Sequence, residues 1–76
     1  MSEELDELRI VAAYLETEGW GFIRRALEKE LRLATEALID ADSERRRGRI
    51  HALRDVLEIP EQVQARIRTL EEEEEA

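Results

Sequence analysis

The sequence contains no cysteine and few residues of several other kinds: one histidine, one proline, three glycines, and one each of tryptophan, tyrosine and phenylalanine. Without cysteine, the chain can form neither a disulfide nor a thiolate metal site. A chain of 76 residues buries only about 60% of its unfolded surface, so a core of its own is marginally stable. Stability must therefore come from helix packing, self-association or docking on a larger partner.

Long apolar runs are absent as well. No segment approaches the roughly 20 apolar residues needed to cross a bilayer. The amino terminus is acidic from Glu3 on, where a signal peptide would be basic. We therefore expect no membrane partner, and a location in the cytoplasm or in a particle assembled there.

Acidic residues outnumber basic residues by 20 to 12, which gives a net charge of −8. A charge of this sign disfavours nonspecific binding to nucleic acid. The acids gather in residues 1–18 and 71–75, and most of the arginines lie between them. This distribution predicts a protein partner, a homo-oligomer or both.

Apolar residues recur at helical spacing of three and four along the chain, and no segment shows the alternation typical of strands. The pattern predicts an all-α fold. Its centre is a helical hairpin of residues 20–41 and 44–58, flanked by two shorter helices at about 3–18 and 60–72.

The ends of these helices follow from local signals. Two glycines at Gly19 and Gly21 each cost about 1 kcal/mol inside a helix, so we expect a bend there, with glycine ending the first helix. Ser2 and Ser43 are suited to cap the first and third helices. Pro60 fits the first turn of the fourth.

Residues 1–70 are predicted to form one small helical domain, followed by an acidic tail at 71–76. The five consecutive glutamates of this tail repel one another and oppose the negative end of the helix dipole. We therefore expect the tail to fray.

The second helix carries two apolar stripes side by side, so its apolar face is wider than one neighbouring helix would cover. We predict that this face is a protein interface, formed by Trp20, Ile23, Leu27, Leu31, Leu33 and Leu38. Two interpretations of Trp20 remain open. It is either an exposed binding anchor or a core residue that closes one end of the helical stack.

A basic patch is the most unusual local feature, and it comprises Arg45, Arg46, Arg47, Arg49 and Arg54. Arginine suits phosphate and carboxylate contacts equally. Binding to nucleic acid would call for aromatic side chains nearby, and these lie elsewhere in the chain. Salt bridges to the acidic first helix or tail of a neighbouring copy need only charges already present, and we favour them.

No motif indicates catalysis or cofactor binding. His51, Asp55 and Glu58 form a row on one helix face, but no second histidine or cysteine completes a zinc site. The serines are explained as helix caps, and the glycines lack the strand and lysine of a phosphate-binding loop. We predict no enzyme activity, no metal, no cofactor and no small-molecule substrate.

A series of residue types in fixed order runs through the middle of the chain: Trp20, Asp42-Ser43-Glu44, Arg47-Gly48-Arg49-Ile50, Ala52-Leu53, Val56-Leu57 and Pro60. Over residues 20–64 this layout resembles short helical-hairpin proteins of tailed bacteriophages and prophages, encoded among packaging and head-assembly genes. The resemblance implies a minor component of the virion or of head assembly, docked on the portal or capsid. It transfers no site residues, and the acidic ends are not part of it.

Three functional hypotheses follow. The first is a non-enzymatic assembly module that associates with itself or docks on a larger complex through the wide apolar face of the second helix. The second is an acidic inhibitor or antitoxin-like protein that blocks a basic nucleic-acid-binding site. The third is a nucleic-acid accessory factor that acts through the patch from Arg45 to Arg54.

Overall fold

The computed structural model describes residues 3–75 and contains, within that range, four helices and no strand. They are α1 (Glu3–Leu15), α2 (Glu18–Asp40), α3 (Glu44–Leu57) and α4 (Ile59–Glu75). The predicted all-α class is confirmed.

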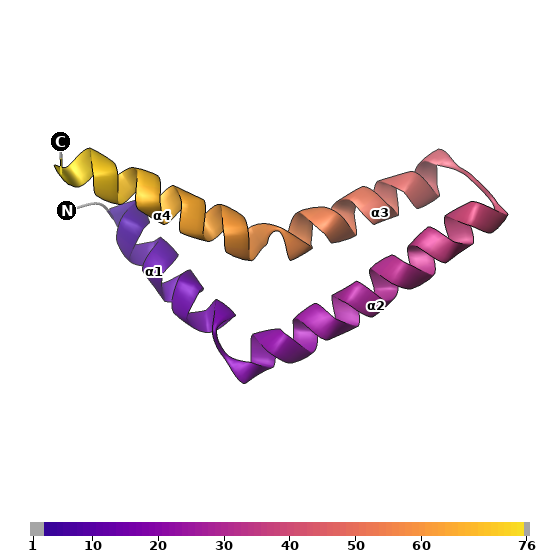
Figure 1. The fold of residues 1–76 in the computed structure, drawn as a ribbon, viewed down its shortest axis with the longest axis horizontal. Coiled ribbons are helices and arrows are strands. Elements are labelled where there is room, and N and C mark those ends of the chain that lie inside the picture. The colour runs from indigo at the N-terminus through magenta and orange to yellow at the C-terminus, as the bar shows by residue number, and fades with distance from the viewer. Residues whose placement is uncertain (1–2, 76) are drawn as a thin grey trace.

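The helices form two pairs, one between neighbours in the chain and one between its two ends. Helix α2 packs chiefly against α3, and α1 packs chiefly against α4, whereas α1 with α2 and α3 with α4 touch over short stretches. The chain runs out along α2, turns and returns along α3 and α4, so that α4 ends beside the start of α1 (Figure 1). The predicted arrangement is confirmed only in part, because α4, with 17 residues, is longer than α3, with 14.

The molecule is a single layer of helices. Its extents are 51 × 26 × 14 Å, and the shortest of these is close to the diameter of one helix with its side chains, about 10–12 Å. The radius of gyration is 16.2 Å, whereas a compact domain of this length has about 11 Å. Both broad faces of the layer are therefore open to solvent.

The connection between α1 and α2 differs from the prediction. The break lies at residues 16–17, and both Gly19 and Gly21 belong to the first turn of α2. Thr17 is the reason, because its hydroxyl donates to the carbonyl of Tyr14 at 2.7 Å and accepts from the amide of Trp20 at 3.4 Å. A capped helix start tolerates glycine better than a helix interior does.

The connection between α2 and α3 follows the prediction. Ser43 is the N-cap of α3, and its hydroxyl accepts a hydrogen bond from the amide of Arg46 at 3.2 Å. The corresponding prediction for Ser2 lies outside the described residues.

Helix α4 includes Pro60 in its first turn, as expected, but the predicted end at residue 72 is wrong, because the helix continues to Glu75. Leu70 is buried against α1, and Glu71 lies 3.8 Å from the guanidinium of Arg9. These contacts hold the turn from which the acidic segment extends. Fraying of that segment stays a prediction.

The core lies between α1 and α4 and not in the α2–α3 hairpin. Its buried members are Leu5, Val63, Ile67 and Leu70, with Leu8, Ala12 and Leu15 packed against them. In the described part of the hairpin, only Trp20 and Ile50 are buried. The longest of the four helices, α2 with 23 residues, thus has a single buried residue, Trp20.

Candidate protein-interaction surface

The hairpin has two faces of different character. On one side, which we call the groove face, α2 and α3 border a shallow groove of about 260 Å³ lined by Glu30, Leu33, Ala34, Ala37, Arg46 and Arg49. On the other side, the opposite face, the groove is lined by Thr35, Leu38, Arg47, Ile50, His51 and Arg54. The same two helices therefore present an aliphatic α2 surface on one side and a more basic surface on the other.

The groove face continues along α2 as an apolar stripe. Ile23, Ala26, Leu33 and Ala37 follow one another at intervals of three, seven and four residues, which places them on one side of a helix. Ile23 is 43% exposed and Leu33 is 46% exposed. On α3, Val56 is also exposed and follows Arg49 by seven residues, so it extends the same face. The stripe runs along most of α2 and is largely exposed, with the ion pair of Glu30 and Arg49 beside it.

The predicted interface residues divide into two groups in the structure. Trp20 is buried, and Leu27, Leu31 and Leu38 are half-buried. The other two, Ile23 and Leu33, are exposed. None of the four leucines of the set is fully enclosed by its own chain.

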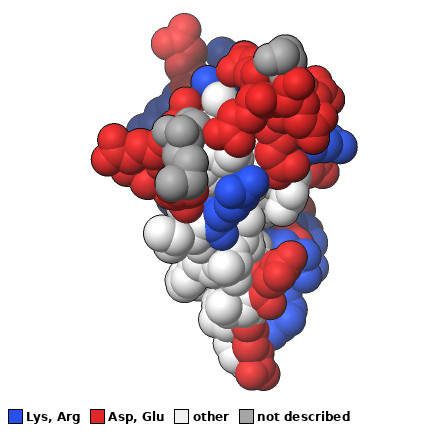
Figure 2. Space-filling view, turned by 90° about the vertical axis from the view of Figure 1, so that its left-hand side faces the viewer, with Lys and Arg blue, Asp and Glu red and all other residues white. Residues whose placement is uncertain are grey.

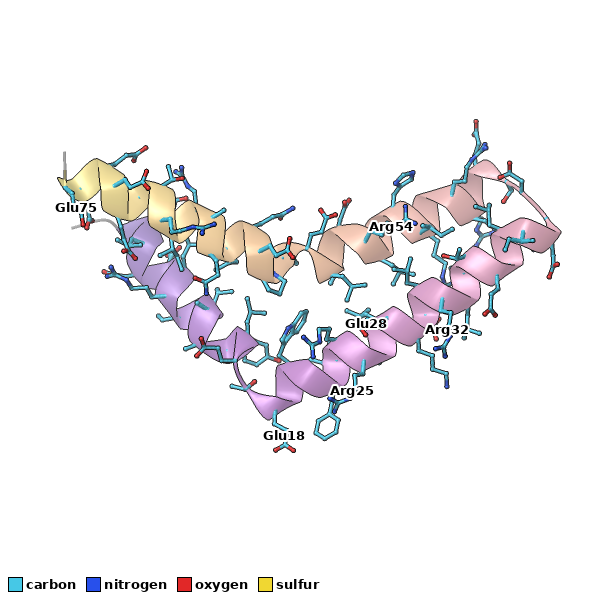
Figure 3. All side chains as sticks on the ribbon, viewed as in Figure 1. Glu18, Arg25, Glu28, Arg32, Arg54 and Glu75 are labelled. Carbon is cyan, nitrogen blue, oxygen red and sulfur yellow. The ribbon has the colours of Figure 1, made fainter. Side chains whose placement is uncertain are left out.

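Several exposed apolar side chains were not among the predicted interface residues. Ile10 and Tyr14 lie on α1, one turn apart, on the side away from the core residues Leu5 and Ala12. Phe22 is exposed at the start of α2. The guanidinium of Arg25 lies 4.8 Å from the centre of the Phe22 ring. Arg25 projects from the side of α2 that faces away from α3 (Figure 3). The sequence signal that could have revealed the exposed residues of α1 is the four-residue spacing of Ile10 and Tyr14, on the side of the helix opposite its core residues.

The five arginines of the predicted basic patch do not share one surface. Arg46 and Arg49 line the groove face, whereas Arg47 and Arg54 line the opposite face. Arg47 lies 3.2 Å from Asp42, and Arg49 lies 2.9 Å from Glu30. Arg45 and Arg54 form no ion pair within residues 3–75. The patch is thus divided between two faces and partly neutralised.

Arg46 has a structural role that the sequence did not reveal. Its Nη1 donates to the carbonyls of Ala37 and Ala41, at 2.9 and 2.8 Å. These carbonyls lie at the C-terminal end of α2, whose last turn carries no basic residue of its own. A guanidinium from α3 therefore supplies the positive charge that stabilises the negative end of the α2 dipole.

We expect Arg46→Ala to lower the free energy of unfolding by about 1 kcal/mol, because the α2 carbonyls lose a charged donor. The matched control is Arg45→Ala, which removes the same charge from the same turn of α3 but breaks no such contact and should change stability by less than about 0.5 kcal/mol. Urea titration followed by circular dichroism measures both. Equal effects of the two substitutions would contradict this role of Arg46.

The acidic ends of the chain meet at one end of the molecule. Acidic side chains crowd the ends of α1 and α4, above a largely uncharged surface (Figure 2). Glu4 accepts two hydrogen bonds from Arg66, from Nε at 3.0 Å and from Nη2 at 3.2 Å. The hydrogen bonds, assisted by the charge of Arg66, lower the pKa of Glu4 below the ordinary value of 4.5, although desolvation acts in the other direction.

The lowered pKa of Glu4 predicts a pH dependence of stability. A carboxyl group whose pKa is lower in the folded state stabilises the protein above its unfolded pKa, and this contribution is lost as the pH falls through the folded value. Glu4→Gln should therefore be slightly less stable than the wild type at neutral pH, and the difference should disappear as the pH falls below 4.5. Thermal unfolding across this range measures it. In an Arg66→Gln background the same substitution should have little effect, and a persistent difference there would rule out the pair as the cause.

Among the described residues, no group of three histidine, cysteine or acidic side chains is arranged so that it could hold a metal ion. None of the helices, over that same range, is long and apolar enough to cross a membrane.

Comparison with known proteins adds no family. No protein-family model matches the chain, and neither a curated protein nor a solved structure is significantly similar to it. The resemblance to phage helical-hairpin proteins stays a prediction.

Proposed function

We propose that this protein is a non-enzymatic protein-interaction module, which assembles with another polypeptide by burying apolar surface that its own helices leave uncovered. The hairpin of α2 and α3 is the docking element, and the α1–α4 pair braces it. A minor component of a phage virion or of its head-assembly machinery, as the resemblance implies, is one role of this kind.

The large accessible surface area of the chain is the observation on which the proposal rests. The chain exposes 5992 Å² for a mass of 8.9 kDa, whereas a folded monomer of this mass exposes about 4,800 Å². The excess, about 1,200 Å², exceeds the roughly 800 Å² that each partner contributes to a stable interface. Burial of apolar surface is worth about 25 cal/mol per Å² before the costs of association.

The position of the exposed apolar side chains supports the same conclusion. Ile23, Leu33 and Val56 lie on one face of the hairpin, and apolar residues there are separated from the core between α1 and α4. Exposed apolar side chains gathered on one face of a protein mark a site of interaction. The mechanism is coverage of the groove face by apolar side chains of a partner.

The unfolding behaviour of the isolated, dilute protein tests the proposal. At about 1 µM, where weak complexes dissociate, the chain should bind a hydrophobic dye and unfold over a broad temperature range. Any polypeptide that covers the apolar surface should suppress dye binding and raise the Tm, since a ligand of the folded state stabilises it. Sharp unfolding with no dye binding by a chain that is monomeric under the dilute conditions would refute the proposal.

A further inference from the structure

We propose that the polypeptide that covers the groove face is a second copy of this chain, laid antiparallel, so that the arginine-bearing tip of each hairpin lies over the α1–α2 junction of the other. This inference rests on the proposed function and names its partner. Three properties of the described residues support it.

The first property is that one face of the hairpin needs cover more than the other. The groove face carries the stripe of Ile23, Ala26, Leu33 and Ala37, whereas Arg47, His51 and Arg54 border the opposite groove. A single layer with one such face is completed by one further layer, because domains are built from two packed layers around a core. A twofold axis achieves this with the same face of both copies and closes the assembly at two chains. The alanines of the stripe allow two α2 helices to approach closely.

The second property is the area available. If each copy buries its excess surface of about 1,200 Å², the dimer buries about 2,400 Å² in total, within the range of obligate homodimers. Burial on this scale would also bring the exposed surface of each chain to the value of an ordinary folded domain.

The third property is the charge at the two ends of the hairpin. The stripe from Ile23 to Ala37 has its midpoint at Glu30, and a twofold axis there places residue 18 of one copy beside residue 42 of the other. Glu18 projects away from the other helices at the α1–α2 junction (Figure 3). It forms no ion pair within the described chain, and neither does Arg45, three residues beyond position 42. Asp42 is already paired with Arg47.

The axis sets the two Glu30 side chains opposite each other, each already paired with Arg49 of its own chain. An antiparallel arrangement lays the start of α3, which carries Arg45, over the α1–α2 junction of the other copy, which carries Glu18, whereas a parallel arrangement would set each of these ends over its own kind. It also keeps the acidic ends of α1 and α4 at opposite ends of the dimer. With a net charge of −8 on each chain, the separation of these ends reduces the repulsion that association must overcome.

Sedimentation equilibrium from about 1 to about 100 µM tests the dimer, since this range spans typical dissociation constants of small oligomers. The wild type should be dimeric towards the upper end of this range. Leu33→Glu places a carboxylate in the centre of the groove face and should weaken dimerisation by about 30-fold or more. The matched control is Ile39→Glu, because Ile39 is 81% exposed and lies one turn after Thr35 on the opposite face. This variant should dimerise like the wild type.

A charge exchange tests the antiparallel arrangement with substitutions that break no contact within the chain. Arg45→Glu and Glu18→Arg should each weaken the dimer about two- to fivefold, the range of exposed ion pairs. The double variant, in which every chain carries both changes, should restore it. Failure of the double variant to recover affinity would overturn the antiparallel arrangement.

The results separate this inference from the proposed function. A wild-type dimer that Leu33→Glu leaves intact would overturn the groove face as the dimer interface. A wild type that is monomeric over the whole range would overturn the second copy as partner, and the proposed function would still stand if that monomer binds the hydrophobic dye. A monomer that unfolds sharply and binds no dye would overturn both.

Discussion

Replacing Leu5 by alanine is expected to lower the free energy of unfolding by about 3 kcal/mol, within the range measured for large-to-small changes in protein cores. Leu5 is 1% exposed and is the most deeply buried side chain of the core between α1 and α4. Removing its branched end leaves a cavity against Val63, Ile67 and Leu70, because paired helices close such a space only partly. Since a domain this small has only about 3–5 kcal/mol of stability, the variant should be close to unfolded.

The measurement is urea unfolding by circular dichroism at one fixed protein concentration, because association changes apparent stability. Ile39→Ala is the control, since it removes a similar side chain that is exposed, and it should change stability by less than about 0.5 kcal/mol. If Leu5→Ala and Ile39→Ala behaved alike, the α1–α4 core would not be what holds the chain together.

Trp20→Ala is expected to cost about 3 kcal/mol as well. Trp20 is buried at the start of α2, where Thr17 fixes the entry of the chain into the helix. Its loss would empty the corner where the two helical pairs meet. Trp20→Phe keeps most of the apolar volume and should cost less than about 1.5 kcal/mol.

Since Trp20 is the only tryptophan, its fluorescence in the wild type reports the same corner. The native emission should lie at the short wavelengths of a buried indole and shift on unfolding. Phe22→Ala, two residues away and exposed, is the control and should leave stability nearly unchanged. If Trp20→Ala weakened association and left the stability of the dilute chain unchanged, Trp20 would be a binding anchor and not a core residue.

The start of α3 and the start of α4 could be predicted from sequence because single residues determine them. Ser43 combines an N-cap hydroxyl with a following run of helix-forming residues, and Pro60 fixes a backbone angle suited to the first turn. The predicted start of α2 at residue 20 is too late, because Gly19 and Gly21 suggest a break where Thr17 already caps the helix. A helix start is decided by which side chain satisfies the free amides, and the glycines that follow it contribute little.

The pairing of α1 with α4 could not be predicted, although both apolar stripes were recognised in sequence. Leu5 and Leu8 on one helix, and Val63 and Ile67 on the other, show which side of each helix is buried but not against what. An apolar stripe does not specify which helix it packs against, because the hydrophobic effect is non-directional. The predicted length of α4 is too short for a related reason. The contact of Arg9 with Glu71 holds the turn from which the acidic segment extends, and this contact exists only because α1 and α4 are paired.

The sequence predicts which helix carries the candidate site, but not which face of that helix is exposed. The sequence indicated that α2 has more apolar surface than one neighbour covers, and the exposure of Ile23 and Leu33 agrees with that. Which stripe would turn inward depended on where α3 lies. The division of the arginines between two faces depended on the same packing, as did the use of Arg46 to cap α2.

The distance along the chain between the members of the core has a consequence for synthesis. Glu4 and Arg66, which flank this core, are 62 residues apart, so the contacts that close it are among the least local that the chain can make. Loop closure over such a separation is slow compared with helix formation. During translation, α1 is synthesised first and stays unpaired until α4 has emerged from the ribosome. The α2–α3 hairpin can form before that. A nascent chain stopped before residue 60 would contain the α2–α3 hairpin without α4.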